Sequence, residues 1–300
     1  MKPIPVILDT DIGSDIDDTW ALALLLKSPE LDLKLVLTDT GNTTYRAQVA
    51  AKVLQAAGRT DIPIGIGLHT YDETGAQEPW VAGYTLDAYP GPIHADGVAA
   101  LIETIMDNPE PVTLICIGPV PNIAAALERE PRIAERARFV GMHGSVRLGY
   151  GGSPEIVQES NVRYYTQECQ RVFSAPWEMM TITPLDTCGL VTLTGEKYRQ
   201  VRDCPDPLIQ ALMENYRIWA EHVTWVRGLD ASAYSSTLFD TVAVYLAFSE
   251  DLLDIEELGI RVTDDGYTLI DETAKVIRCA TAWKDLEAFE DLLVARLTHT

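Results

Sequence analysis

The chain has 300 residues, and its 47% hydrophobic content is enough to bury a substantial α/β core. Acidic residues outnumber basic residues 45 to 23, which gives a formal net charge of −22 and argues against nucleic acid or an anionic membrane as a partner. The five cysteines are scattered without C-x-x-C spacing, so we expect no disulfide framework, no thiolate zinc site and a cytoplasmic location. No apolar run reaches 18 residues, and we therefore expect no membrane span.

Strands and helices are predicted to alternate along most of the chain. Apolar runs indicate buried strands at about residues 4–8, 33–38, 63–66, 112–117, 137–142 and 179–183. Helical patterns separate these runs and return at about 207–226, 240–248 and 286–297. The helix at 207–226 is amphipathic, and we expect its Trp219 and Trp225 to lie in the core. Short strands at about 258–262, 267–270 and 275–279 suggest an antiparallel addition near the C-terminus. We therefore expect one α/β domain over residues 1–300, with an open, mostly parallel, Rossmann-like sheet flanked by helices.

Two loops are long or glycine-rich enough to suggest a role in binding. Residues 67–95 show little periodicity and form the kind of long loop that often serves as a lid. Residues 143–152 contain several glycines and are expected to close on a ligand. This second loop lacks G-x-G-x-x-G spacing, so a dinucleotide fold is not indicated.

The acidic stretch of residues 9–18 is the feature around which the site is predicted. It holds Asp9, Asp11, Asp15, Asp17 and Asp18 between an apolar strand and a largely apolar helix. Five like charges at this density repel one another unless something neutralises them, and a divalent cation does so most simply. The carboxylates would lie at the carboxyl end of the first strand, the usual ligand position in an open α/β sheet.

Three other interpretations of the acidic stretch compete with a cation site at the carboxyl end of the first strand. The first, which assigns no function, is a solvated acidic turn with a single helix-capping Asp. An EF-hand loop fails, because its sixth and twelfth positions would be Ser14 and Trp20 instead of Gly and Glu. A phosphatase with an Asp nucleophile and Mg²⁺, built on Asp9 and Asp11, remains an alternative function.

Five motifs in chain order together resemble the nucleoside hydrolases of the inosine–uridine-preferring family. They are ILDTDIG at 7–13, Asp17-Asp18, TGN at 40–42, ESN at 159–161 and Phe239-Asp240. The resemblance extends from residue 4 to about 297. It implies hydrolysis of the N-glycosidic bond of a ribonucleoside by a water that Ca²⁺ positions, with ribose clamped around the metal at the carboxyl ends of the strands. It also implies a homodimer or homotetramer whose only other partner is the small-molecule nucleoside.

The resemblance further implies a role for individual residues. The metal ligands would be Asp11, which also orients or deprotonates the attacking water, together with Asp18, the backbone carbonyl of Ile117, and Asp240. The ribose hydroxyls would be bound by Asp17, Asn42, Glu159, Asn161 and, again, Asp240. The turn is two residues longer here than in the family, which leaves open whether Asp15 takes the place of Asp17.

Elementary chemistry agrees with these roles. Breaking an N-glycosidic bond creates oxocarbenium character at C1′, so the site needs a positioned water, a base and fixed negative charge near the sugar. Hard oxygen ligands suit Ca²⁺ better than zinc. Taken singly, however, Asp240 also fits a helix cap, and Asn42 and Asn161 also fit turn residues.

One departure from the family pattern concerns the proton donor for the leaving base. The family commonly has His immediately before the last Asp, and this chain has Phe239, which cannot donate a proton but can stack on the base. His94 is the replacement we expect, although an ordinary surface-loop His fits its position equally; His143 and Tyr150 are weaker candidates. A non-catalytic ribose-binding relative, disabled at Phe239, is therefore a second alternative function.

Overall fold

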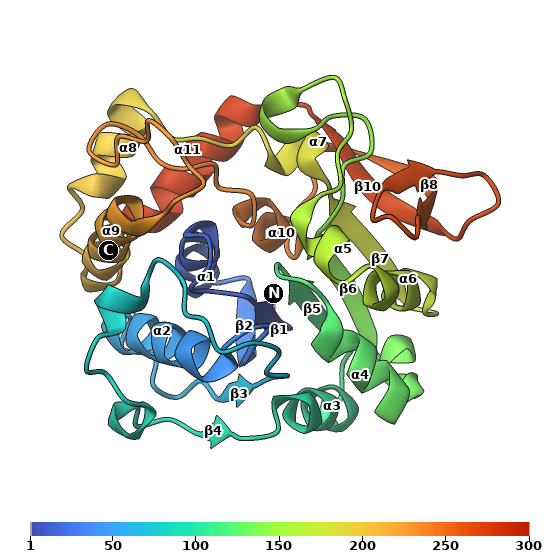
Figure 1. Cartoon of the computed structure of the whole chain (residues 1–300), viewed down its shortest axis with the longest axis horizontal. Coiled ribbons are helices and arrows are strands. Elements are labelled where there is room, and N and C mark those ends of the chain that lie inside the picture. Colours follow the sequence, from blue (N-terminus) through green and yellow to red (C-terminus); the bar gives the residue numbers. More distant parts are fainter. Residues whose placement is uncertain (1, 300) are drawn as a thin grey trace.

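A ten-stranded sheet forms the centre of the computed structural model, which describes residues 2–299 (Figure 1). The strand order is β4-β3-β2-β1-β5-β6-β7-β10-β8-β9. Neighbouring strands from β4 to β10 pair in parallel, whereas β8 pairs antiparallel with both β10 and β9. The predicted fold is confirmed, including the antiparallel addition near the C-terminus.

Except for β4, which lies in the long loop expected at residues 67–95, the strands have bounds close to those expected. They are β1 (Ile4–Thr10), β2 (Leu31–Thr38), β3 (Ile64–Ile66), β4 (Ile93–His94), β5 (Val112–Cys116), β6 (Ala137–Met142), β7 (Met179–Thr183), β8 (Leu253–Val262), β9 (Thr268–Ile270) and β10 (Val276–Trp283). The antiparallel strands β8 and β10 are longer than predicted. In β8 the added residues 253–257 include three acidic side chains, which hide the strand pattern.

Eleven α-helices and four 3₁₀ turns connect the strands within the described residues. The α-helices are α1 (Asp17–Leu26), α2 (Thr43–Ala56), α3 (Gly97–Asp107), α4 (Pro121–Arg129), α5 (Ser160–Tyr164), α6 (Thr166–Ser174), α7 (Leu185–Cys188), α8 (Gly195–Arg202), α9 (Pro207–His222), α10 (Thr241–Leu246) and α11 (Leu286–Thr298). The 3₁₀ turns are η1 (Glu78–Val81), η2 (Leu86–Ala88), η3 (Pro131–Glu135) and η4 (Tyr150–Gly152). No helix in this part of the chain is long and apolar enough to cross a membrane.

Helices cover both faces of the sheet, and the strands are buried accordingly. Val6 and Leu8 of β1 belong to a core that includes α1, α2, α9 and α10, whereas Ile7 between them belongs to a core that includes α3, α4 and α6. Figure 1 shows these two groups of helices. Because successive side chains of a strand point to opposite faces, a strand buried on both faces must be apolar throughout. This requirement explains the apolar run that precedes the aspartates.

Asn122, at the start of α4, joins three segments at the carboxyl edge of the sheet. Its Nδ2 donates to Asp9 Oδ1 and to the Thr38 carbonyl, each at 3.0 Å, and its Oδ1 accepts from the Leu68 backbone N–H at 2.9 Å. The Asn122 side chain is fully buried. It therefore fixes the ends of β1 and β2 and the loop after β3 relative to one another.

We predict that Asn122→Leu lowers the free energy of unfolding by roughly 3–5 kcal/mol, because each buried polar partner left without a hydrogen bond costs about 1–3 kcal/mol. Asn108→Leu is the matched control, since Asn108 is partly exposed and its Nδ2 donates only to the Glu110 carbonyl. This control should change stability by less than about 1 kcal/mol. Urea unfolding followed by circular dichroism measures both. Equal losses in the two variants would contradict a joining role for Asn122.

Candidate active site

A pocket of about 680 Å³ lies at the carboxyl ends of the central strands. The loop after β1 forms one wall, and the segments after β2, β5 and β6 contribute to the others. Its acidic lining residues are Asp11, Asp15, Asp17, Asp18, Glu159 and Asp240. Its aromatic lining residues are Tyr71, Tyr150, Tyr164, Tyr165, Trp225 and Phe239. One end of the parallel sheet thus gathers side chains that are far apart in sequence.

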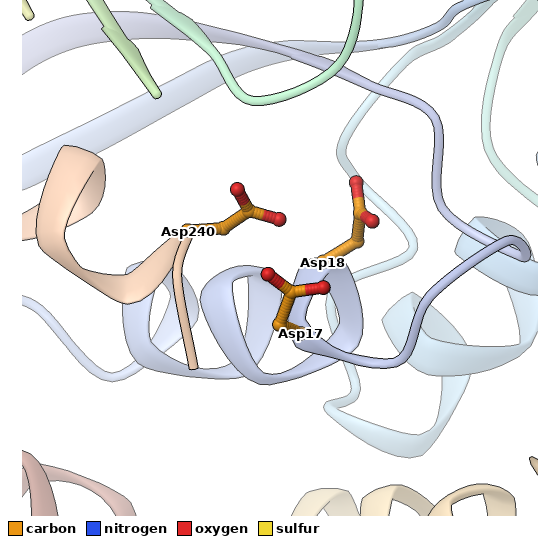
Figure 2. Close-up of side chains that lie close together, drawn as sticks. All are labelled: Asp17, Asp18 and Asp240. Carbon is orange, nitrogen blue, oxygen red and sulfur yellow. The ribbon is translucent and has the colours of Figure 1, made fainter. Parts of the chain in front are cut away.

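Asp17, Asp18 and Asp240 form the tightest acidic group of this pocket. Each offers a carboxylate oxygen, and these oxygens lie within 4.8 Å of one another (Figure 2). Asp17 and Asp18 are the first residues of α1, and Asp240 immediately precedes α10. The start of α1 favours negative charge through the helix dipole. All three residues are buried, with 4%, 2% and 3% of their surface exposed.

The charged forms of these three carboxyl groups are energetically unfavourable when no cation is bound. Burial raises the pKa of each well above its usual value, and repulsion from neighbouring aspartates raises these pKa values further. A hydrogen bond from Thr10 Oγ1 to Asp18 Oδ1, at 2.5 Å, opposes this effect only in part. Buried carboxylate oxygens that converge on one point are the donor set of a hard divalent cation such as Ca²⁺ or Mg²⁺. The residues present therefore fit the metal that the sequence led us to expect.

The longer turn between β1 and α1 separates Asp15 from Asp17. Asp17 belongs to the tight group, whereas Asp15 does not; its Oδ1 accepts from the Ile16 N–H at 2.7 Å. Burial raises the pKa of Asp15 to about 6. Asp11 lines the pocket too, but it lies outside the tight group and its Oδ2 lies 3.8 Å from Arg46 Nη2. Of the four metal ligands we expected, only Asp18 and Asp240 carry carboxylates of the tight group.

Buried side chains hold the backbone of this turn from both flanks. Arg46 of α2 donates to the carbonyls of Asp11, Ile12 and Thr40. Tyr45, also of α2, donates through Oη to the Gly13 carbonyl at 3.0 Å. From other segments, Trp219 Nε1 donates to the Ser14 carbonyl at 3.1 Å and Gln77 Nε2 to that of Asp15 at 2.6 Å. Sequence reasoning missed these supports, because a lone Arg, Gln or Trp in a helix or loop gives no signal of its distant partner.

Glu159 and Asn161 lie together in the lining of the same pocket. Glu159 caps α5 and accepts three backbone N–H groups, from Gly144, Asn161 and Val162. Burial nevertheless raises its pKa to about 7. Asn161 Nδ2 donates to the carbonyls of Ile117 and Met142, each at 3.0 Å, which leaves Oδ1 as the atom that can accept from a ligand hydroxyl. The structure thus brings Glu159, Asn161 and Ile117 to the pocket, as expected.

Two expected site residues lie elsewhere. His94 is exposed on β4, the edge strand of the sheet, and does not line the pocket, so this structure does not place it where a leaving base would bind. Asn42 caps α2, where its Oδ1 accepts from the Tyr45 N–H at 3.0 Å and its Nδ2 donates to the Asp72 carbonyl at 3.1 Å. It also lies outside the lining, and Thr40 occupies the pocket wall after β2 instead.

The two weaker candidates for a proton donor differ in position. His143 is fully buried beside Phe139 and Phe173, and burial lowers its pKa to about 3. It does not line the pocket, whereas Tyr150 does. The Tyr150 ring meets the Phe239 ring edge to face, with their centroids 5.9 Å apart. Phe239 therefore takes part in an aromatic wall of the pocket.

Trp225 was expected in the core, and the structure corrects this expectation. Its surface is 59% exposed and it lines the pocket. The helix that was predicted to contain it ends at His222, three residues earlier. Because the helical pattern stops there, the aromatic periodicity on which the prediction rested does not extend to Trp225.

Asp9 is placed where it cannot serve as a nucleophile. It is fully buried, accepts from Asn122 and does not line the pocket, and burial raises its pKa to about 8. A phosphatase built on Asp9 would need this carboxylate to reach the substrate and to be ionised. The structure therefore leaves a phosphatase without Asp9 as its nucleophile.

Comparison with known proteins agrees with this geometry. Pyrimidine-specific ribonucleoside hydrolase RihA of Klebsiella pneumoniae (strain 342) is 25% identical, with 98% of each chain covered. A protein of the same name from Enterobacter sp. (strain 638) is 34% identical over about half of each chain. In structure, the chain resembles the plant nucleoside hydrolase PpNRh1 (TM-score 0.84, 23% identity, 99% and 100% covered) and the purine-preferring ribonucleoside hydrolase from Gardnerella vaginalis (TM-score 0.76, 21%, 98% of each).

A family model covers nearly the whole chain. The model for inosine-uridine preferring nucleoside hydrolases matches residues 6–291, a span that includes the acidic turn, Glu159, Asn161 and Asp240. The resemblance seen in the motifs is thereby confirmed. This chain belongs to the family of inosine-uridine preferring nucleoside hydrolases.

Proposed function

We propose that the chain hydrolyses the N-glycosidic bond of a ribonucleoside in this pocket, with Ca²⁺ as its metal. The observation that carries the proposal is the group of Asp17, Asp18 and Asp240, buried in one pocket with Glu159 and Asn161. When bound there, Ca²⁺ would neutralise carboxylates and acidify a neighbouring water. Ile117 also lines the pocket, and its backbone carbonyl would be a further oxygen ligand.

The remaining polar groups suit a ribose. Asn161 Oδ1 accepts from one ribose hydroxyl, while Nδ2 stays bonded to backbone carbonyls. Glu159 is held by three backbone N–H groups, so its carboxyl stays oriented while it meets another hydroxyl. Asp11 takes the proton of the attacking water, because it lines the pocket and is not one of the three tightly grouped carboxylates. The negative charge of this floor stabilises positive charge that develops at C1′.

Calcium should stabilise the protein through the tight acidic group. At about a hundredfold excess over Kd, ligand binding contributes about 2.7 kcal/mol, or an increase in Tm of roughly 5 °C for a chain of this size. Asp240→Asn should lose most of this increase, because it removes a charged ligand. Asp87→Asn, an exposed change outside the pocket, should keep it. Thermal unfolding with calcium and with EDTA measures the difference; an equal calcium effect in both variants would contradict the site.

The metal-free protein should become less stable as pH rises from about 4 to 8. Burial raises the pKa of Asp15 to about 6, of Glu159 to about 7 and of Asp9 to about 8. A group whose pKa is raised on folding stabilises the fold below its unfolded pKa, and this contribution is lost as pH rises through the folded pKa. Urea unfolding in EDTA across this pH range tests the direction. A metal-free stability that rises towards pH 8 would be the opposite result.

Asp17 and Asp15 should differ sharply in catalysis. Asp17→Asn should lower kcat/KM for uridine by about 10²-fold or more, because it removes charge that stabilises the transition state. Asp15→Asn should cost less than about tenfold, because Asp15 lies outside the tight group. Release of reducing sugar measures both variants at saturating calcium. A larger loss in Asp15→Asn would exchange the two roles, and ribose binding without turnover in the unaltered protein would favour the non-catalytic alternative.

A further inference from the structure

The pocket has two chemically distinct parts. The floor is acidic and contains Asp11, Asp15, Asp17, Asp18, Glu159 and Asp240. The mouth is defined here as the aromatic lining residues Tyr71, Tyr150, Tyr164, Tyr165, Trp225 and Phe239. Of the six large hydrophobic side chains that are exposed in the described part of the chain, four belong to the mouth. Exposed aromatic faces gathered at a pocket mark a binding surface for a planar group.

No Lys, Arg or His lines the pocket within residues 2–299. Arg46 lies behind the acidic turn, where it bonds backbone carbonyls, and its Nη2 lies 3.8 Å from Asp11 Oδ2 and donates to Tyr71 Oη at 3.4 Å. Arg163 lies over the Tyr164 ring, 4.7 Å from its centroid, and is not part of the lining. A bound divalent cation would offset only two of the six formal charges of the floor. The pocket therefore keeps an excess of negative charge and of aromatic faces, both of which attract cations.

A neutral nucleobase is a poor leaving group in such a pocket. When the bond from C1′ to the base nitrogen breaks, its electron pair moves to the base, which leaves as an anion unless it is protonated. Phe239 cannot supply a proton, and the only side chains of the mouth with an acidic O–H are tyrosines. Tyr150 hydrogen-bonds Ser160, and burial raises its pKa to about 12, which makes it a weaker acid. An anionic base would also face the carboxylates of the floor.

A base that is already cationic avoids both difficulties. Its electron pair neutralises the ring as the bond breaks, so the base leaves neutral and needs no proton. Water forms the new bond to C1′ and gives a proton to the floor, from which it passes to solvent. During this step positive charge moves from the ring in the mouth towards C1′ above the acidic floor. The floor thus stabilises the transition state more than the bound substrate, which is the requirement for catalysis.

We propose that the preferred substrates are ribonucleosides with a cationic base, of the N7-alkylpurine or N-glycosylpyridinium type, whose ring binds in the aromatic mouth. This inference rests on the proposed function and specifies its substrate class. It explains two features together, namely the Phe239 that replaces a proton donor and the lining that lacks a basic side chain. A neutral base stacked in the mouth would explain the aromatic residues, but it would not explain why Phe239 replaces a proton donor or why the lining lacks a basic side chain.

Guanosine and 7-methylguanosine form a matched pair that differs by one methyl group and one charge. With calcium present, kcat/KM should be at least about 10²-fold higher for 7-methylguanosine, since general-acid help is worth about 10²–10⁴-fold. p-Nitrophenyl riboside supplies a good leaving group without positive charge, and each rate is divided by the uncatalysed rate of the same compound. After this correction, 7-methylguanosine should still exceed both guanosine and the activated riboside.

Variants separate recognition of charge from leaving-group ability. Trp225→Leu should raise KM for 7-methylguanosine by about 2- to 30-fold, in line with a lost cation–π contact, and should change KM for p-nitrophenyl riboside less. Phe239→His should raise kcat/KM for guanosine and lower it for 7-methylguanosine, because the new side chain can donate a proton but repels a cation when charged. Ile270 is exposed on β9, and Ile270→Ala should change neither KM nor kcat/KM for either substrate. Tm values confirm that each variant is folded.

The outcomes distinguish the inference from the proposed function. If uridine and guanosine are hydrolysed as efficiently as 7-methylguanosine after correction, the cationic preference is refuted and the hydrolase assignment stands. If Phe239→His improves both members of the matched pair equally, charge recognition is likewise refuted. If no nucleoside of either type is hydrolysed with calcium present, the proposed function itself fails. A corrected preference for the cation that Trp225→Leu weakens supports the inference.

Discussion

The cost of burying several carboxylates at one end of the sheet governs the structure of the site. Asp17, Asp18 and Asp240 approach within 4.8 Å, and both burial and mutual repulsion disfavour their charged forms. The protein offsets this cost only partly. Thr10 donates to Asp18, α1 directs its N-terminus at Asp17 and Asp18, and three backbone N–H groups hold Glu159. Because part of the cost of burying these charges is not offset by the protein, a hard divalent cation would stabilise the three carboxylates.

Precise placement of these carboxylates depends on supports from distant parts of the chain. The turn from Asp11 to Asp15 presents its carbonyls to buried donors on α2, on the loop before η1 and on α9. Asn215 Nδ2 of α9 in turn donates to Gln77 Oε1 at 2.6 Å, which links the supports to one another. Such a network holds the carboxylates of the site in one geometry and keeps the long, charged turn ordered.

The division of the pocket into an acidic floor and an aromatic mouth relates geometry to chemistry. Fixed negative charge near the sugar favours an oxocarbenium-like transition state, so the floor suits N-glycoside cleavage in general. Under the proposed function, the base would lie in the mouth. Because Phe239 cannot donate a proton there, the demand for acid catalysis would shift from the enzyme to the base itself. Both parts arise from loops at the carboxyl ends of strands, while the sheet supplies a rigid frame.

The sequence by itself determined the α/β fold, the family and most of the residues at the site. Apolar runs buried on both faces identify parallel strands, and the aspartates that directly follow β1 must lie at its carboxyl end, because chain order places them there. Only the tertiary structure decided that Asp17 and not Asp15 joins Asp18 and Asp240, since the turn from Asp11 to Ile16 has no periodic pattern from which its course could be predicted. It also excluded His94 from the pocket and brought Trp225 into it. The physical reason is that loop conformation depends on long-range partners such as Arg46 and Trp219, whereas strand and helix patterns are local.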